Sequence, residues 1–248
     1  MKEGFDPQET EADYLPAVLV EGGGVVAVAK PAGLATQAPP GMPSAEAWLR
    51  ARLDAGAYLG VPHRLDRVVS GVLLLAVTPR AARKLSRQFE RREITKTYLA
   101  LVAGEPPAAL AAGAAEWRDM LVKVPDEPRA RIAGAAEPGA REAVTLVRTL
   151  AHPLPGTLLL GLEPLTGRMH QLRVQAASRG LPIVGDTHYG AGPSALSAFA
   201  PTVDPRRHAI ALHAWQIRYT DPDTGTSITI EAPLPQRWPA EVREAIAS

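Results

Sequence analysis

The chain has 248 residues, of which 46% are hydrophobic and 21% are charged, and its formal net charge is +1. These totals are typical of a globular protein and exclude a disordered chain, and the absence of an apolar run of roughly 20 residues excludes a membrane-spanning helix. The absence of cysteine excludes disulfides and thiolate metal sites and favours a reducing, cytoplasmic location.

The N-terminal part of the chain predicts a tail, a strand and a short helix. Residues 1–13 are polar and acidic without periodicity, so we expect them to form a flexible tail. The glycines at 22–24 precede an apolar stretch at 25–29, which predicts a turn followed by a strand. Apolar residues then recur at helical spacing up to residue 53, and this pattern predicts a short helix with Ser44 as its N-cap.

A dense polar loop over residues 63–70 leads directly into an apolar stretch at residues 72–77. That stretch has no charge and is mostly aliphatic, so it predicts a strand that is buried on both faces and holds the loop at its N-terminal edge. Within the loop, Asp66 lies between Arg64 and Arg67, whose positive charges favour the ionised carboxylate. An ionised, rigidly placed Asp66 suits a nucleophile or a base. The alternative is an ion-paired turn with only a structural role.

The next segment predicts a helix with two different faces. Thr78 suits its N-cap and Pro79 its first helical position. One face is apolar and is predicted to pack, and the opposite, basic face consists of Arg80, Lys84, Arg87 and Arg91. Residues 80–96 contain seven Lys or Arg and two Glu, a local charge of +5. We predict that the basic face contacts phosphate; a solvated helix surface is the alternative.

The rest of the chain predicts mostly strands. Residues 96–102 alternate in polarity, which places Tyr98 opposite Thr97 and Leu99 and predicts that it points into a cleft. Further strands are predicted at 117–124, 144–150, 157–162, 211–219 and 226–232, and loops at 104–116, 125–143 and 190–208. A helix predicted over 169–178 places His170 and Arg173 on one face. With no long linker, residues 14–248 are predicted to form one mixed α and β domain.

Two other kinds of catalytic site find little support. The six histidines are scattered and no His-Glu-x-x-His pattern occurs, which argues against a metal site. Ser70, His63 and Asp66 lie close in sequence, as a Ser-His-Asp hydrolase would allow. No Gly-x-Ser-x-Gly elbow surrounds Ser70, however, so we predict that Ser70 and Gly71 shape the turn into the strand.

Five sequence blocks occur in order between residues 14 and 236. They are Lys-Pro-Ala-Gly-Leu at 30–34, His-Arg-Leu-Asp at 63–66 with Ser-Gly at 70–71, Lys-Thr-Tyr-Leu-Ala-Leu-Val at 96–102, Thr-Gly-Arg-Met-His-Gln-Leu-Arg at 166–173 and Gly-Leu-Pro-Ile-Val-Gly-Asp at 180–186. In kind and order they resemble the blocks of the RluA-type pseudouridine synthases. The resemblance implies an α+β fold with a mixed, largely antiparallel sheet, flanking helices and a central RNA-binding cleft. It also implies a catalytic domain without the S4-type domain of many relatives.

The resemblance implies an isomerase that converts specific uridines of rRNA or tRNA to pseudouridine without a cofactor. Asp66 matches the family's essential aspartate, which acts on the ribose of a flipped-out uridine as nucleophile at C1′ or as base at C2′. Tyr98 matches the active-site tyrosine that stacks on the base, and Arg173 matches the basic residue that pairs with the aspartate. Arg64 matches the residue that contacts RNA around the extruded uridine.

We therefore expect structured RNA as the partner of a monomer that needs no second protein. Further RNA contacts are predicted from His63, Arg67, Lys96, Arg168, His170, Arg80, Lys84 and Arg87. Val69 and Gln175 depart from the Thr and His of many relatives, but neither position is catalytic in the family. The alternative function is a catalytically silent RNA-binding protein on the same fold. Asp66 argues against it, because a carboxylate beside RNA would repel phosphate.

Overall fold

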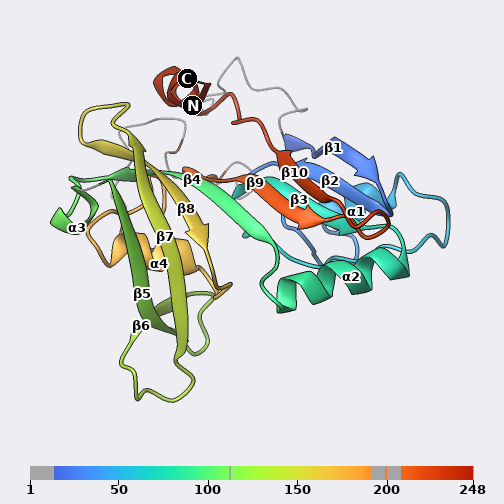
Figure 1. Ribbon diagram of the computed structural model, residues 1–248, viewed down its shortest axis with the longest axis horizontal. Helices are drawn as coiled ribbons and strands as arrows, with labels where there is room; N and C mark the ends of the chain where they lie inside the picture. The colour runs from blue at the N-terminus through green and yellow to red at the C-terminus, as the bar shows by residue number, and fades with distance from the viewer. Residues whose placement is uncertain (1–13, 112, 191–198, 200–207, 248) are drawn as a thin grey trace, which may run out of the picture.

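The computed structural model describes residues 14–111, 113–190, 199 and 208–247 (Figure 1). The expected tail at 1–13 and most of the expected loop at 190–208 lie outside these residues. The described strands are β1 (Ala17–Gly22), β2 (Val25–Lys30), β3 (Ser70–Ala76), β4 (Thr95–Ala103), β5 (Ala114–Lys123), β6 (Ala130–Ala133), β7 (Arg141–Ala151), β8 (Thr157–Pro164), β9 (Leu212–Thr220) and β10 (Ser227–Glu231). The described helices are α1 (Ala45–Arg50), α2 (Pro79–Glu90), α3 (Ala108–Ala111), α4 (Gln171–Ala177) and α5 (Ala240–Ala247).

One sheet contains all the described strands. Their order is β1-β2-β3-β9-β4-β8-β7-β5-β6, and β10 pairs with β9 beside this path. The β3–β9 pairing is parallel, whereas the other pairings are antiparallel. Together with the helices, this arrangement confirms the expected α+β fold with a mixed, largely antiparallel sheet.

Strand β3 is buried on both faces, as its uninterrupted apolar sequence predicts. All seven residues are buried. Val72, Leu74 and Ala76 pack on one side with residues of α2, and Leu73 and Leu75 pack on the other side with residues of α1. The strand therefore anchors the polar loop that precedes it between two apolar layers.

The two helices that cover β3 begin where the sequence predicts. The Ser44 hydroxyl accepts a hydrogen bond from the Ala47 N–H, and the Thr78 hydroxyl accepts one from the Ala81 N–H. These bonds satisfy backbone donors that have no partner inside the helix. On α2, Leu85 is fully buried against β3, so the apolar face packs as expected.

The parallel contact between β3 and β9 sets the position of the polar loop. It consists of two residue pairs, Ser70 with His213 and Gly71 with Ala214. Gly71 has a φ of +122°, and a Cβ at this position would lie 2.2 Å from the Ala214 carbonyl oxygen. Only glycine permits this close approach, so Gly71 brings the end of the loop directly against β9.

Figure 1 shows two halves that meet near β4 and β9. One half contains β1, β2, β3 and β10 with α1 and α2, and the other contains β5–β8 with α3 and α4. The core of the second half includes Leu99, Leu159 and Leu172, and Trp238 joins this core from the segment before α5. Both halves contribute residues to the cleft described below.

The structure corrects several boundaries in the second half. Residues 104–116 contain α3 and the start of β5, and residues 125–143 contain β6 and the start of β7; both stretches were predicted as loops. The Ala, Gly and charged residues in these stretches have low strand propensity. Antiparallel pairing of β5 with β6 and β7 nevertheless stabilises the strand segments. Among the described residues, no helix is long and apolar enough to cross a membrane.

Candidate active site

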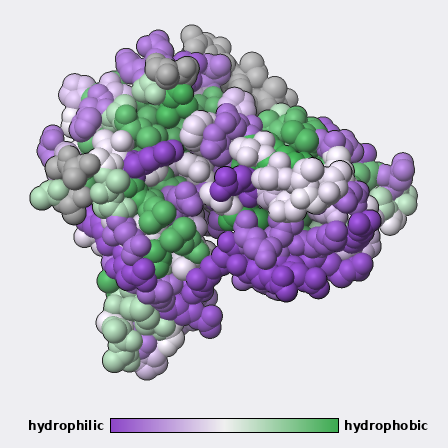
Figure 2. Space-filling model, viewed as in Figure 1, coloured by the Kyte–Doolittle hydropathy of each residue, from purple (hydrophilic) through white to green (hydrophobic). Residues whose placement is uncertain are grey.

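A large cleft lies between the two halves and brings most of the predicted site residues together. Its volume is about 1420 Å³, and Figure 2 shows a notch between the hydrophilic surface of α2 and the end of the β5–β7 half. It is lined by all three predicted catalytic residues and by most of the predicted RNA contacts: Asp66, Tyr98, Arg173, His63, Arg64, Arg67, Lys96, Arg168 and His170. These residues come from distant segments, so the fold assembles the site.

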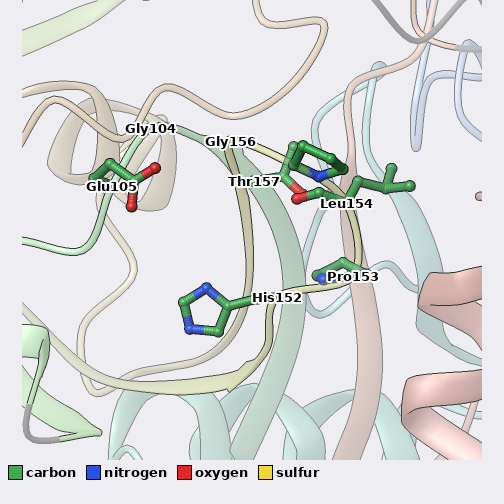
Figure 3. Close-up of a pocket in the computed structure, with 8 residues that line it drawn as sticks. Gly104, Glu105, His152, Pro153, Leu154, Gly156 and Thr157 are labelled. Carbon is green, nitrogen blue, oxygen red and sulfur yellow. The ribbon is translucent and has the colours of Figure 1, made fainter.

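A second, smaller cavity shares no lining residue with this cleft. It measures about 310 Å³ and lies between Gly104–Glu105 and the β7–β8 turn. Figure 3 shows the side chains of Glu105 and His152 at its edge. Both residues are exposed. Glu105 follows the far end of β4 from Tyr98, and neither residue lines the cleft.

Asp66 and Arg173 form the pair that the sequence predicts. Arg173 Nη1 lies 3.4 Å from Asp66 Oδ2, across 107 residues of sequence. Arg173 is almost fully buried on α4, with 5% of its side chain exposed, whereas 38% of the Asp66 side chain is exposed. The carboxylate is therefore accessible from the cleft while a buried cation stabilises its charge.

Asp186 also binds Arg173, and the sequence had not identified it as a site residue. Its carboxylate accepts two hydrogen bonds from Arg173, at 2.6 Å from Nε and 2.7 Å from Nη2, and its side chain is 1% exposed. Burial opposes the charge of Arg173, but the hydrogen bonds and charge of Asp186, together with Asp66, raise the pKa of Arg173. The only signal for Asp186 was its place in the block at 180–186.

His170 approaches the same oxygen of Asp66 as Arg173 does. Its Nε2 lies 3.6 Å from Asp66 Oδ2, and its Nδ1 lies 2.9 Å from the Tyr189 hydroxyl. The helix starts later than predicted, because His170 is the N-cap of α4 with a left-handed φ of +51°. Burial lowers the pKa of His170, Asp66 opposes this effect, and Arg173 adds to it. His170 is therefore neutral near pH 7.

Buried polar contacts brace the loop that carries Asp66. Lys30 is 1% exposed, and its Nζ donates to the carbonyl oxygens of Pro31 and Leu34 at 2.8 Å and of Arg67 at 3.4 Å. Burial lowers the pKa of Lys30 to about 7, although the charge of Asp66 opposes the shift. These contacts support the prediction that Asp66 is rigidly placed.

Tyr98 lies on β4 and lines the cleft, as predicted. Its side chain packs against two hydrophobic clusters, one that contains Leu172 and one that contains Leu65. Burial and the nearby charge of Asp66 raise the pKa of the phenol. Tyr98 therefore presents a neutral hydroxyl at neutral pH.

His63 braces the loop against the sheet. Its Nε2 accepts a hydrogen bond from the Leu74 N–H at 2.9 Å, and its ring stacks on Phe89 at a centroid distance of 4.6 Å. Burial, with a smaller effect of Lys96, lowers the pKa of His63 to about 3. Although His63 lines the cleft, one of its ring nitrogens is already bound to the backbone.

The predicted RNA contacts divide into two groups. Arg64, Arg67, Lys96 and Arg168 line the cleft, together with Arg92 and Lys123, which were not singled out from the sequence. The basic face of α2 does not line it: Arg80 pairs with Asp223 at 3.4 Å, and Lys84 Nζ donates to the Pro222 carbonyl oxygen at 2.5 Å. Arg87 is also absent from the cleft lining.

Ser70 takes part in a different pair from the one a hydrolase would require. Its hydroxyl lies 2.8 Å from His213 Nδ1, and both residues are buried. His63 is bound to Leu74 instead, so His63, Ser70 and Asp66 do not form a triad. In the described part of the chain, no three His, Asp or Glu side chains are grouped in a way that would hold a metal ion.

Known proteins resemble this chain in both sequence and fold. A family model described as RNA pseudouridylate synthase matches residues 24–178. The chain is 37% identical over 171 residues to the dual-specificity RNA pseudouridine synthase RluA of Escherichia coli (strain K12), covering 69% of this chain and 71% of that protein. It is 34% identical over 243 residues to the ribosomal large subunit pseudouridine synthase D of Nitrosomonas europaea, covering 92% of this chain and 65% of that protein.

Two further comparisons extend these matches. The tRNA pseudouridine synthase C of Salmonella typhimurium is 37% identical over 202 residues, covering 75% of this chain and 72% of that protein. The solved structure of human RNA Pseudouridylate Synthase Domain Containing 1 superposes with a TM-score of 0.70 at 25% identity, covering 92% of this chain and 86% of that chain. The matched sequence, the shared fold and the order of the blocks agree: this chain belongs to the RNA pseudouridylate synthase family.

Proposed function

We propose that this protein isomerises uridine to pseudouridine in structured RNA, either ribosomal or transfer RNA, with Asp66 as the catalytic carboxylate. One observation carries the proposal: Asp66 lies in a large cleft with a buried arginine 3.4 Å from one of its oxygens. An adjacent guanidinium favours the ionised carboxylate. A charged carboxylate that is still accessible from the cleft suits attack on a ribose or removal of a proton from it.

The reaction rearranges one nucleotide and needs no other reactant. The bond between N1 of uracil and C1′ of ribose breaks, the base turns, and a new bond joins C5 to C1′. C5 loses its hydrogen as a proton, and N1 gains one, so atoms and electrons balance. Asp66 acts either as nucleophile at C1′ or as base at C2′, and both routes begin with an ionised carboxylate next to the ribose.

The uridine must leave its stack before Asp66 can reach it. Extrusion of a base costs a few kcal/mol, and cationic and aromatic groups around the extruded base offset this cost. Arg64 and Arg67 are exposed on the loop that carries Asp66, and Tyr98 lines the same cleft. We assign to Arg64 a contact with the RNA around the position that the extruded uridine leaves, and to Tyr98 stacking on the extruded base.

Phosphate binding is assigned to the cleft. Among the described residues its lining contains seven Lys or Arg and three carboxylates, Asp66, Glu90 and Glu163, whereas the net charge of the whole chain is only +1. Arg92 at the end of α2 and Lys123 at the end of β5 contribute cations from the two halves. The basic face of α2 stays a competing prediction, although two of its members already contact the β9–β10 turn.

The activity is tested by release of tritium from RNA labelled at C5 of uridine, because bond formation at C5 must expel its hydrogen. RNA from native cells that lack the gene serves as substrate, and the expected result is release without added metal or nucleotide. Binding of this RNA without any release would support the catalytically silent RNA-binding protein instead. Mapping pseudouridines in cells with and without the gene would identify the target uridine.

The working form of the protein is part of the same proposal. We infer that it acts in the cytoplasm as a monomer without an obligatory protein partner. Light scattering after size-exclusion chromatography should give a mass near 26.3 kDa, and tritium release should persist in the purified protein. A stable dimer at assay concentration would contradict the inferred monomer.

A further inference from the structure

Tyr189 joins three parts of the molecule through its hydroxyl group. The hydroxyl accepts a hydrogen bond from the Ala130 N–H at 2.9 Å and lies 2.9 Å from His170 Nδ1. Ala130 is the first residue of β6, and His170 is the N-cap of α4 beside Asp66. A single side chain therefore connects the β5–β6 hairpin to a direct neighbour of the catalytic carboxylate.

The direction of the Tyr189–His170 hydrogen bond depends on the tautomer of His170. The Ala130 N–H donates to the Tyr189 oxygen, and the phenolic hydrogen is then available for donation to His170 Nδ1. A neutral imidazole has one N–H and one acceptor nitrogen. When Nδ1 accepts from Tyr189, the hydrogen of His170 is on Nε2, which is the nitrogen that lies 3.6 Å from Asp66 Oδ2.

The opposite tautomer would be unfavourable in this site. A hydrogen on Nδ1 would turn the Nε2 lone pair toward the negative Asp66 carboxylate. Protonating both nitrogens would remove this repulsion, but burial lowers the pKa of His170 more than the Asp66 charge raises it, and the buried Arg173 cation lowers it further. Of the two neutral forms, the one with hydrogen on Nε2 therefore fits the surrounding charges.

We propose that Tyr189 is a positioning residue that sets the tautomer of His170, so that the His170 Nε2–H faces the Asp66 carboxylate. The inference rests on the proposed function and adds a residue to which neither the sequence nor the family blocks assigned a role. Tyr189 also lies with its ring 5.2 Å from the Arg173 guanidinium carbon. It thus contacts both groups that approach Asp66 from α4.

The tautomer can be measured without reference to activity. In protein labelled with ¹⁵N histidine, two-bond proton–nitrogen correlations distinguish a hydrogen on Nε2 from one on Nδ1, and the His170→Gln spectrum identifies the signal of His170. We expect the Nε2–H pattern in the unmodified protein at pH 7. Tyr189→Phe keeps the ring but removes the hydroxyl, and it should give a mixture of tautomers. An Nδ1–H pattern before the change, or an Nε2–H pattern unaltered by it, would overturn the proposal.

The kinetic consequence separates positioning from RNA binding. Tyr189→Phe should lower kcat for tritium release by about tenfold, because it removes one orienting hydrogen bond, and should change KM for RNA less than twofold. When Tyr189→Phe is combined with His170→Gln, kcat should fall no further than in His170→Gln alone, because both changes disable the same contact. Tyr58→Phe, outside the cleft lining, is the matched control and should leave kcat unchanged.

The two proposals fail in distinguishable ways. If the unmodified protein releases no tritium from any native RNA, the proposed function fails, and the tautomer of His170 is still measurable by spectroscopy. If the unmodified protein is active and Tyr189→Phe retains its full kcat, Tyr189 does not position the catalytic unit. A fall in kcat that matches a loss of folded protein, measured by circular dichroism, would show a structural role only and would also reject the proposal.

Discussion

Arg173 is held more closely by Asp186 than by Asp66. Two short hydrogen bonds of 2.6 and 2.7 Å join its guanidinium to Asp186, whereas the contact with Asp66 is 3.4 Å. Charge-assisted bidentate bonds of this kind are strong and directional. Asp186 therefore fixes the position of the Arg173 guanidinium. The positive charge of Arg173 stabilises the Asp66 carboxylate, but the guanidinium does not bind Asp66 tightly. A nucleophile or base benefits from this arrangement, because its lone pairs stay available.

Asp186→Asn should reduce turnover although it leaves Asp66 and Arg173 in the sequence. The change removes the charge that anchors Arg173, and loss of one partner from a buried ion pair typically costs about 3–5 kcal/mol of stability. We expect at least a tenfold loss in single-turnover tritium release per folded molecule. Asp119→Asn is the control, since Asp119 pairs with Arg179 at 2.9 Å outside the cleft lining. It should lower urea stability without changing turnover.

Elements with a local signal could be predicted from the sequence. Strand β3 is predicted by an uninterrupted apolar run, and α2 is predicted by Thr78 and Pro79 at its start. Burial on both faces and N-capping each depend on the residue types of a few neighbouring positions, so they can be recognised locally. The pairing of Asp66 with Arg173 came from the resemblance to a family. The two residues are 107 positions apart in the sequence, and no local sequence pattern indicates a contact over that separation.

The missed features depend on contacts between distant segments. Asp186 is 13 residues from Arg173, and Tyr189 is 59 residues from Ala130, so their roles are visible only after folding. Strand β6 has the sequence Ala-Arg-Ile-Ala, and its exposed middle residues resemble a loop. Pairing with β5 defines it as a strand, and such tertiary stabilisation overrides weak local propensity.

Two buried histidines should make the protein more stable as pH rises from about 4 to 6.5. Burial lowers the pKa of His63 to about 3 and of His213 to about 4, from an ordinary value of 6.5. Between these limits the unfolded chain binds protons that the folded chain does not, so the free energy of unfolding increases with pH. Each histidine contributes roughly 3 kcal/mol at most over this range.

Urea unfolding at several pH values checks this expectation. His63→Gln keeps a side-chain oxygen that can accept from the Leu74 N–H but removes one titrating group. The slope of unfolding free energy against pH should then fall by close to one proton between pH 4 and 6.5. An unchanged slope would show that His63 is not neutral in the folded protein.

Asp66 and Arg173 should behave as one functional unit in a double-mutant cycle. Asp66→Asn removes the charge that performs the chemistry, so turnover should vanish while folding and RNA binding persist. Arg173→Met should also cut turnover severely, and the double variant should be little worse than either single variant, because residues that act together are not additive. Additive losses in tritium release would contradict the pairing, and substantial turnover by Asp66→Asn would contradict the mechanism.

The stability of the same variants provides a second criterion. Arg173→Met leaves the buried carboxylate of Asp186 without its cation, which should destabilise the fold by about 3–5 kcal/mol. Asp66→Asn keeps the Arg173–Asp186 bonds and exchanges a partly exposed group, so it should change stability by less than about 1 kcal/mol. Equal destabilisation of both variants in urea would show that Asp66 contributes to the fold as much as Arg173 does.

The cations of the cleft, and not the basic face of α2, should determine how RNA binding depends on salt. Each lost phosphate contact lowers the slope of log K against log salt concentration by about 0.7–0.9. Arg92→Gln with Lys123→Gln should therefore reduce the slope by about 1.5, as measured by fluorescence anisotropy with labelled RNA. Arg80→Gln with Arg87→Gln removes the same charge from α2 and should leave the slope unchanged, since neither residue lines the cleft and Arg80 is paired with Asp223. The reverse result would place the phosphate contacts on the basic face.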